Sequence, residues 1–320
     1  MTSDHDAQHF VAPREEIPLL PADPLNVEAT HRSLWADAWW KLRRRPLFII
    51  SSLMILMIIV VVLFPGLFTQ TPPNENCHLA NSAGPPVPGH PLGFTFQGCD
   101  VYSRIIHGTQ ASVAVGLLSV SGVLVIGVTF GAVSGYYGGW IDAVLARLSD
   151  IFFALPLVLG ALVVAQLPPV RENKSVWTVA LVISLLGWPQ MARITRGAVL
   201  EVSNAEFVTA AKSLGVSKFG TLARHVLPNC MAPVVVLAPL ELGTFIVTEA
   251  TLSFLGIGLP QSVMSWGQDI AAAQHLVRTD PMILIYPAVA LSITVLSFIM
   301  LGDALRDAFH PNSRRRSRKR

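Results

Sequence analysis

Charged residues are scarce in this chain of 320 residues. Asp, Glu, Lys and Arg together make up 13% of the sequence, about half of the share usual for a soluble domain. Residues of the hydrophobic classes make up 52%. This balance excludes an ordinary soluble surface and indicates a membrane protein.

The motifs of the common catalytic sites are also missing. The sequence has no Cys-x-x-Cys, no His-Glu-x-x-His and no Gly-x-Ser-x-Gly, so the strong signals for a zinc site, a metalloprotease and a serine hydrolase fail. It has no Gly-x-x-x-x-Gly-Lys loop to cradle a nucleotide phosphate. We therefore expect no enzyme in this chain and no bound cofactor or metal, and any ATP-driven work would need ATP and Mg²⁺ on a separate subunit.

Long apolar runs, in contrast, are abundant. A transmembrane helix needs ~20 mostly apolar residues, and six runs approach or exceed that length: residues 47–68, 111–135, 151–167, 176–191, 231–259 and 282–301. The third and fourth runs are short and contain Pro156 and Pro189, so each alone could be a buried helix of a soluble protein. The six runs together predict an all-α polytopic membrane protein with six spans.

The basic residues predict the orientation of these spans. Lys41 and three arginines stand just before the first run, whereas residues 69–103 contain no Lys or Arg. Because cytoplasmic loops retain Lys and Arg, the N-terminus is expected inside, and alternation places the "RRRSRKR" tail inside as well. Only the "RENKS" turn opposes the rule. Both termini are thus predicted to be cytoplasmic, with the tail against anionic lipid rather than nucleic acid.

These signals divide the chain into six segments. Residues 1–29 are a polar cytoplasmic tail, and residues 30–46 form an interfacial amphipathic helix or, alternatively, a simple basic anchor. Residues 47–68 are the first span, residues 69–108 an extracytoplasmic loop, and residues 109–303 a five-helix core that includes a cytoplasmic loop at 203–229. Residues 304–320 are the basic tail.

Small residues and cysteines give two local predictions. Gly127, Gly131 and Gly135 recur at every fourth position of the second run, which favours close approach of another helix. Cys77 and Cys99 both fall in the predicted extracytoplasmic loop, where disulfides persist. We predict that they are bonded, with two free thiols as the alternative.

Two acidic residues lie within the fifth apolar run. Glu241 and Glu249 are eight positions apart, a little over two helical turns, so they fall on broadly the same side of a helix. An ionisable group inside a membrane is a functional candidate by default, and the pair could line a substrate path or carry protons. The alternative is that both are buried and hydrogen-bonded for structural reasons.

The polar segment after the fourth run predicts a helical hairpin. Residues 205–214 and 217–225 have helical patterns, separated by Gly215 in a left-handed conformation, with Ser217 as a cap and Pro228 as a stop. Phe207, Ala210, Ala211 and Leu214 share one face at i, i+3, i+4 and i+7. This face is a docking surface with small residues at its centre, or the face of a hairpin lying on the bilayer.

The same segment resembles the cytoplasmic coupling loop of ATP-binding cassette importer permeases. In "TAAKSLG" and the following "VLP", the residues Ala210, Ala211, Gly215, Leu227 and Pro228 match the family pattern, while Thr209 and His225 depart from the general form and resemble its dipeptide and oligopeptide branch. "HPLGFTFQGCDVYSRIIHG", "GYYGGWIDAVLARLSD", "TEATLSFLGIGLPQSVMSWG" and "LGDALRDAFHP" are similar to further signatures of that branch, with Phe94 and Cys99 departing. The resemblance runs from about Leu34 to Pro311.

The resemblance implies a type I importer permease fold in a bacterial cytoplasmic membrane. It implies a homologous second permease, P-loop ATPase subunits and an extracytoplasmic solute-binding protein as partners, and peptides as substrate. The residues implied to contact the ATPase are Ala210, Ala211, Gly215, Leu227 and Pro228, with Phe207 and Leu214 as apolar anchors. A proton-coupled secondary transporter that uses Glu241 and Glu249 is the alternative, and a membrane-embedded enzyme is weaker.

Overall fold

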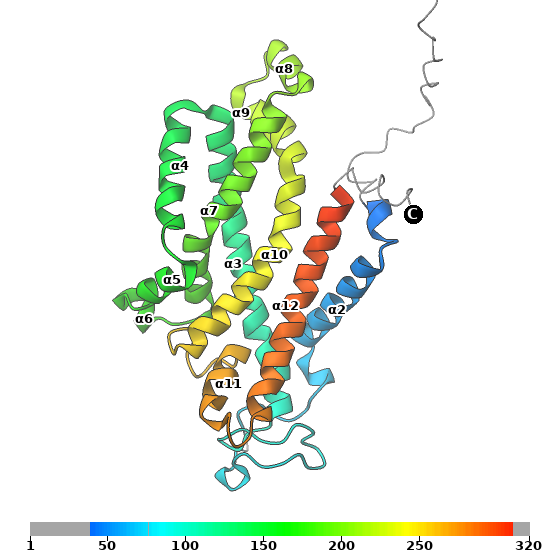
Figure 1. The fold of residues 1–320 in the computed structure, drawn as a ribbon, viewed down its shortest axis with the longest axis vertical. Coiled ribbons are helices and arrows are strands. Elements are labelled where there is room, and N and C mark those ends of the chain that lie inside the picture. Colours follow the sequence, from blue (N-terminus) through cyan, green and yellow to red (C-terminus); the bar gives the residue numbers. More distant parts are fainter. Residues whose placement is uncertain (1–38, 76, 310–320) are drawn as a thin grey trace, which may run out of the picture.

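The chain folds into an elongated bundle of helices (Figure 1). The structure, a computed structural model, describes residues 39–75 and 77–309. The long helices are α2 (Pro46–Leu63), α3 (Val101–Tyr137), α7 (Val176–Ser203), α10 (Leu227–Phe254) and α12 (Met282–Phe309). The shorter ones are α4 (Gly139–Phe153), α5 (Leu157–Ala165), α6 (Pro168–Glu172), α8 (Glu206–Ser213), α9 (Lys218–Thr221) and α11 (Trp266–Ala273).

The bundle has two distinct ends. The short helices α8 and α9 project from one of them, here called the hairpin end, and residues 69–100 fold over the opposite one, here called the loop end (Figure 1). The loop contains the 3-10 turn η2 (Leu79–Asn81) and two isolated bridges, Val87 with His90 and Phe94 with Asp100. Helix α11 lies beside this loop (Figure 1). The predicted loop of residues 69–108 therefore ends earlier, because α3 begins at Val101.

Several helix boundaries follow from capping chemistry. The Asp100 side chain accepts a hydrogen bond from the Ser103 backbone N–H at 3.1 Å, which satisfies one of the free N–H groups at the start of α3. At the start of α7, Ser175 and Thr178 form a reciprocal capping box. Gly138, with φ +63°, ends α3 and leads directly into α4.

The third predicted span is not one straight helix. In its place α4 and α5 are separated by a short break and bent by 84°. Pro156 causes the break, because it has no N–H to donate and it disfavours a helical conformation at Leu155 before it. The prediction of a single run over 151–167 was therefore wrong in both its start and its continuity.

The number of membrane spans is partly supported. Within the described residues, four helices are long and apolar enough to cross a membrane, or up to five if the bent α4–α5 pair is one span. Helix α7 has 28 residues but is not among those that meet this criterion. The six-span count remains a prediction that requires both α4–α5 and α7 to cross.

Helices α2 and α12 bring the two ends of the described chain together. Arg45 Nη1 lies 2.6 Å from Asp307 Oδ2, and Leu42 is buried against Ala304 and Ala308. The start of α2 and the end of α12 both lie toward the hairpin end (Figure 1), as an even number of crossings requires. Of the predicted segment 30–46, only residues 39–46 are described; the predicted tail 1–29 and most of 304–320 lie outside the described residues.

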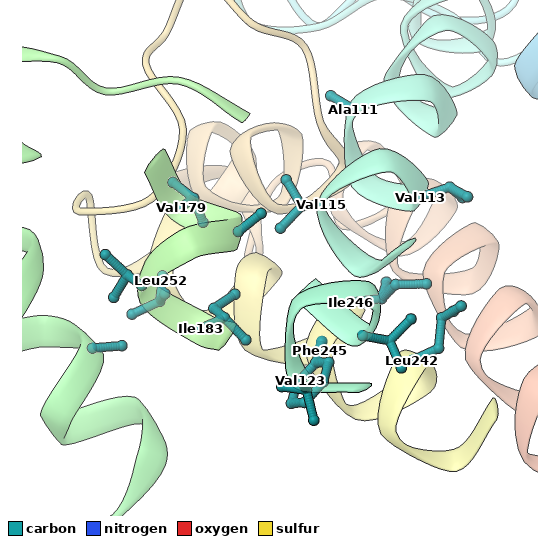
Figure 2. Close-up of a cluster of buried hydrophobic side chains, with 14 of the residues drawn as sticks. Ala111, Val113, Val115, Val123, Val179, Ile183, Leu242, Phe245, Ile246 and Leu252 are labelled. Atoms are coloured by element: carbon teal, nitrogen blue, oxygen red, sulfur yellow. The ribbon is translucent and has the colours of Figure 1, made fainter. Parts of the chain in front are cut away.

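The core is built where α3 crosses α7 and α10. Figure 2 shows Val115 and Val123 of α3, Ile183 of α7 and Phe245 and Ile246 of α10 converging there. The glycine ridge allows this approach: a methyl group added at Gly127 would lie 2.7 Å from Met191 Cβ, and one at Gly135 would lie 2.9 Å from the Arg196 carbonyl oxygen. The predicted close helix contact is confirmed, and α7 is the partner.

Candidate functional site

The hairpin end carries the helical hairpin that the sequence predicts. Helix α8 ends at Ser213, and Gly215 follows with φ +82°, a left-handed conformation that glycine adopts without steric cost. The Ser217 side chain then accepts a hydrogen bond from the Gly220 N–H at 3.1 Å at the start of α9. The predicted break and cap are both confirmed.

The predicted stop at Pro228 is wrong. Helix α9 continues through a π-turn, η3 (Leu222–Val226), directly into α10, in which Pro228 is the second residue. In the π-turn the Leu227 N–H bonds the Leu222 carbonyl five residues back. A proline is tolerated here because the first turn of the new register does not need its missing N–H. The result is one continuous rod, Lys218–Phe254, of 37 residues.

The outer face of the hairpin exposes large apolar side chains. Leu214 is 85% exposed, Phe219 72% and Phe207 46%. Ala210, Gly215 and Pro228 are also exposed, and Leu227 is half-buried. Phe219 was missed in the sequence because it lies in the variable stretch between the matched residues Gly215 and Leu227. An aromatic residue two positions after a helix cap in a polar segment was the available signal. Exposed apolar groups in such a cluster indicate a surface for another protein or for lipid.

Ala211 does not belong to that outer face. It is 7% exposed, and its neighbour Val208 is fully buried. Val208 belongs to a small core that includes Leu222, Val226 and Cys230. At 100° per residue, position 211 lies about 40° from position 207 and about 60° from position 208, at the border between the exposed and the buried side of α8. Of the two alanines at the centre of the predicted face, Ala210 is exposed and Ala211 is buried.

Glu249 lies inside the protein, in a network of serines. Its side chain is fully buried, and Oε1 accepts hydrogen bonds from Ser253 Oγ at 2.8 Å and Ser265 Oγ at 3.1 Å. Ser265 also caps α11 by accepting from the Gln268 N–H at 3.3 Å. Glu249 thus ties the start of α11 to α10, as the structural alternative for this residue anticipated.

Glu241 has different surroundings, although it lies on the same helix. It is 6% exposed and lines a cavity of about 330 Å³ bounded by the α4–α5 break, α7 and α10. Its Oε1 has no hydrogen-bond partner among the described residues. The two glutamates that the sequence grouped together therefore occupy two separate environments: Glu249 is bonded to two serines through Oε1, with Oε2 unpartnered among the described residues, and Glu241 lies beside a cavity.

The loop end is held by a disulfide and by polar contacts. Cys77 and Cys99 are joined, with their Cα atoms 4.3 Å apart. Arg104 donates from Nε to Asp269 Oδ1 at 2.8 Å and from Nη1 to Asn74 Oδ1 at 2.5 Å. Burial raises the pKa of Asp269, and the Arg104 guanidinium opposes that rise. These contacts fasten the loop and α11 to the start of α3.

Comparison with known protein families gives two matches, which cover separate parts of the chain. Residues 127–315 match the family described as "Binding-protein-dependent transport system inner membrane component". Residues 33–86 match "N-terminal TM domain of oligopeptide transport permease C". The two matches leave a gap that contains most of the loop-end disulfide segment and the first half of α3.

Individual relatives cover almost the whole chain. The dipeptide transport system permease protein DppC of Alkalihalophilus pseudofirmus is 32% identical over 312 residues, which is 97% of this chain and 99% of that protein. The oligopeptide transport system permease protein OppC of Bacillus subtilis is 34% identical over 283 residues, 88% of this chain and 91% of that protein. The glutathione transport system permease protein GsiD of Pectobacterium atrosepticum is 35% identical over 226 residues, 71% of this chain and 74% of that protein.

The fold also matches a solved transporter. The inward-facing MetNI methionine ABC transporter superimposes with a TM-score of 0.52 at 19% identity, over 64% of this chain and 96% of that chain. At this identity the likeness concerns the fold alone. The family matches and the relatives identify the chain as a member of the dipeptide and oligopeptide permease family of ABC importers, a multi-pass membrane protein.

Proposed function

We propose that this chain is a transmembrane permease subunit of an ATP-driven importer of dipeptides or oligopeptides in a bacterial cytoplasmic membrane. The observation that supports this most is the projecting hairpin, whose Phe207, Leu214 and Phe219 are exposed and do not belong to the core cluster of the described residues beneath it. In a member of this permease family without a phosphate-binding loop, such a surface is suited to contact with an ATPase subunit.

The proposal includes the partners that the family resemblance implied. A homologous second permease would complete the translocation path, P-loop ATPase subunits would bind ATP and Mg²⁺, and an extracytoplasmic solute-binding protein would deliver substrate at the loop end. The ATPase would contact Ala210, Gly215 and Pro228 besides the three apolar side chains. Ala211 and Leu227 would act from beneath, by holding the hairpin in shape.

The hairpin is built to pass on a movement. Helix α9 continues without interruption into α10, so a displacement of the hairpin is carried by a continuous helix toward Glu241 and Glu249. Rigid elements gripped at one end can convert a domain motion into a two-state change across a membrane. In this proposal, closure of the ATPase pair would turn the rod between inward-open and outward-open arrangements.

A peptide substrate is supported by the names of the relatives. The three closely similar permeases described above belong to systems for dipeptides, oligopeptides and glutathione. The proton-coupled alternative has less support, because Glu249 is hydrogen-bonded to two serines of its own chain and the family is one of binding-protein-dependent transport.

The proposal is tested by uptake into vesicles. The chain would be co-purified with its permease, ATPase and binding-protein partners, reconstituted, and supplied with radiolabelled trialanine. We expect uptake that requires ATP inside the vesicle, on the side of the membrane where the ATPase subunits lie. We also expect this uptake to persist when an ionophore collapses the proton gradient. Uptake driven by an imposed proton gradient without ATP would contradict the proposal and restore the alternative.

A further inference from the structure

We propose that the cavity beside Glu241 is a subsite for an alkylammonium group, such as the amino terminus of a peptide in transit. The substrate class in this inference rests on the proposed function. The cavity itself is a feature of the described chain: it measures about 330 Å³, which is near the lower limit of typical ligand sites and suits one end of a small peptide.

The cavity has few polar groups, and each of them carries an oxygen atom that can accept a hydrogen bond. Besides the Glu241 carboxyl group, they include the Gln190 amide and the Thr244 hydroxyl. Glu241 and Thr244 are three residues apart on α10, so their side chains are neighbours on one face of the helix. When it is ionised, the carboxyl group supplies negative charge, and the amide and hydroxyl oxygens can accept further hydrogen bonds from an ammonium group.

Glu241 has no ion-pair partner among the described residues. Its side chain is 6% exposed and its Oε1 has no hydrogen-bond partner among the described residues. No Lys or Arg lines the cavity. Arg193 stacks on the Phe153 ring at 4.1 Å and lies 3.7 Å from Asp150, outside the cavity lining. A buried acid of this kind is costly to retain without a cation, and a passing ligand can supply one.

Aromatic rings complete the recognition of a cation. Phe152, Phe153 and Phe245 line the same cavity, and the faces of aromatic rings attract ammonium groups. The Phe153 ring already carries the Arg193 guanidinium, 4.1 Å from its centroid, so Phe152 and Phe245 are the rings left for a ligand. The same carboxylate would repel the carboxyl end of a peptide, so the subsite selects the end of the ligand that carries positive charge.

Charge-selective labelling tests the subsite without requiring transport. Thr244 is exposed and lines the cavity, so Thr244→Cys places a thiol next to Glu241. Cys230→Ser removes the remaining unbonded cysteine and leaves the Cys77–Cys99 disulfide in place. The assembled complex, in nanodiscs without ATP, would be treated with 2-aminoethyl or 2-sulfonatoethyl methanethiosulfonate, and the labelling rates compared.

We expect the cationic reagent to label Thr244→Cys faster than the anionic one, by about tenfold relative to the same ratio for a free thiol, because an acid in a partly enclosed site attracts cations. Adding Glu241→Gln should remove this preference, whereas Glu201→Gln, which removes an exposed acid elsewhere, should not. Equal rates for both reagents in the assembled complex would overturn the inference. This result would also follow if a basic side chain of the second permease neutralised Glu241, and in that case too Glu241 would not be free to bind an ammonium group.

Protection by peptides identifies the group that is recognised. Millimolar trialanine, with a free α-amino group, should slow the labelling, and so should N-acetyl-Ala-Ala-Lys, whose side chain carries an alkylammonium group. N-acetyltrialanine has no amine and should not protect. Equal protection by trialanine and N-acetyltrialanine would overturn the inference. Because no ATP is used, a failure here leaves the uptake test of the proposed function unaffected, and a failure of ATP-dependent uptake leaves this result interpretable.

Discussion

Arg104 and Asp269 form an ion pair across 165 positions of the sequence, with Arg104 Nε 2.8 Å from Asp269 Oδ1. The side chains are 16% and 9% exposed. The pair joins the first turn of α3 to the middle of α11, which is too short to be stable alone. Together with the Glu249–Ser265 bond, it holds α11 against the bundle from two sides.

Arg104→Ala should destabilise the protein by about 3 kcal/mol, because it leaves the Asp269 carboxylate buried without its partner. The measurement is thermal unfolding of the purified protein in detergent, followed by a fluorescent thiol-independent dye or by circular dichroism. Arg306→Ala is the matched control, since its pair with Asp303 is 57% and 52% exposed and should contribute about 0–1 kcal/mol. Equal losses for the two variants would contradict a special role for Arg104.

The pH dependence of the same variant has a defined sign. Burial raises the pKa of Asp269 above its ordinary value of 3.8, and removing Arg104 removes the group that opposes this rise. A carboxyl group with a raised folded-state pKa stabilises the fold when it is protonated, and that contribution is lost as the pH rises through the folded-state value. Arg104→Ala should therefore regain stability relative to the wild type as the pH is lowered toward 4. A constant difference between pH 7 and pH 4 would count against this account.

Gly127→Ala should destabilise the α3–α7 contact by about 1–3 kcal/mol through overpacking. The added methyl group would lie 2.7 Å from Met191 Cβ and 3.0 Å from the Trp188 carbonyl oxygen. Gly197→Ala is the control, because a methyl group there meets no atom within 4 Å and alanine favours a helix by about 1 kcal/mol over glycine. The two variants should shift the thermal midpoint in opposite directions, and a fall in both would show that helix packing is not the cause.

Features that depend on neighbouring residues were predicted from the sequence better than features that depend on contacts between distant residues. The glycine ridge, the left-handed Gly215 and the Ser217 cap follow from neighbouring residues alone, and all three are present. The break at Pro156 was visible as a proline, but its 84° bend depends on packing against α7. The fates of Glu241 and Glu249 depend on Ser265 and on the α4–α5 break, which are distant in sequence, so spacing along one helix could not separate them.

Leu214→Asp should abolish ATP-dependent uptake while the protein still folds and inserts. Leu214 is 85% exposed, so its own stability contribution is within about 0.5 kcal/mol, whereas an apolar anchor of an interface contributes about 2 kcal/mol or more to binding. Uptake and co-purification of the ATPase are the measurements. Ser213→Asp adds the same charge at the neighbouring position and is the control. Normal uptake by Leu214→Asp would remove this residue from the contact.

Ala211→Arg should act differently, because Ala211 is buried, with 7% of its surface exposed. A charged side chain there must leave the core or displace the hairpin, so we expect protease cleavage within residues 205–217 in addition to lost uptake. Limited proteolysis followed by mass spectrometry distinguishes the two variants. Intact, protease-resistant Ala211→Arg protein would mean that the inner face of α8 is more tolerant than its burial indicates.

Removing the Cys77–Cys99 disulfide should loosen the loop end without unfolding the bundle. The bond closes a segment with a sequence separation of 22, for which a chain-entropy argument gives about 3 kcal/mol. Cys99→Ser, or reduction of the wild type, should therefore increase proteolysis within residues 69–100, while Cys230→Ser should not. Mass spectrometry of unreduced peptides should recover the linked pair, and complete alkylation of both cysteines without reductant would exclude the bond.

The unbroken passage from α9 into α10 has a mechanical consequence. The rod Lys218–Phe254 has 37 residues, about 55 Å at 1.5 Å per residue, and its Phe245 and Ile246 are fully buried in the core. If the rod pivots at these two residues, its arms measure about 42 Å and 12 Å. A shift of ~4 Å at the hairpin would then move the end that carries α11 by ~1 Å in the opposite direction, so a large stroke on one side of the membrane becomes a small, forceful one on the other.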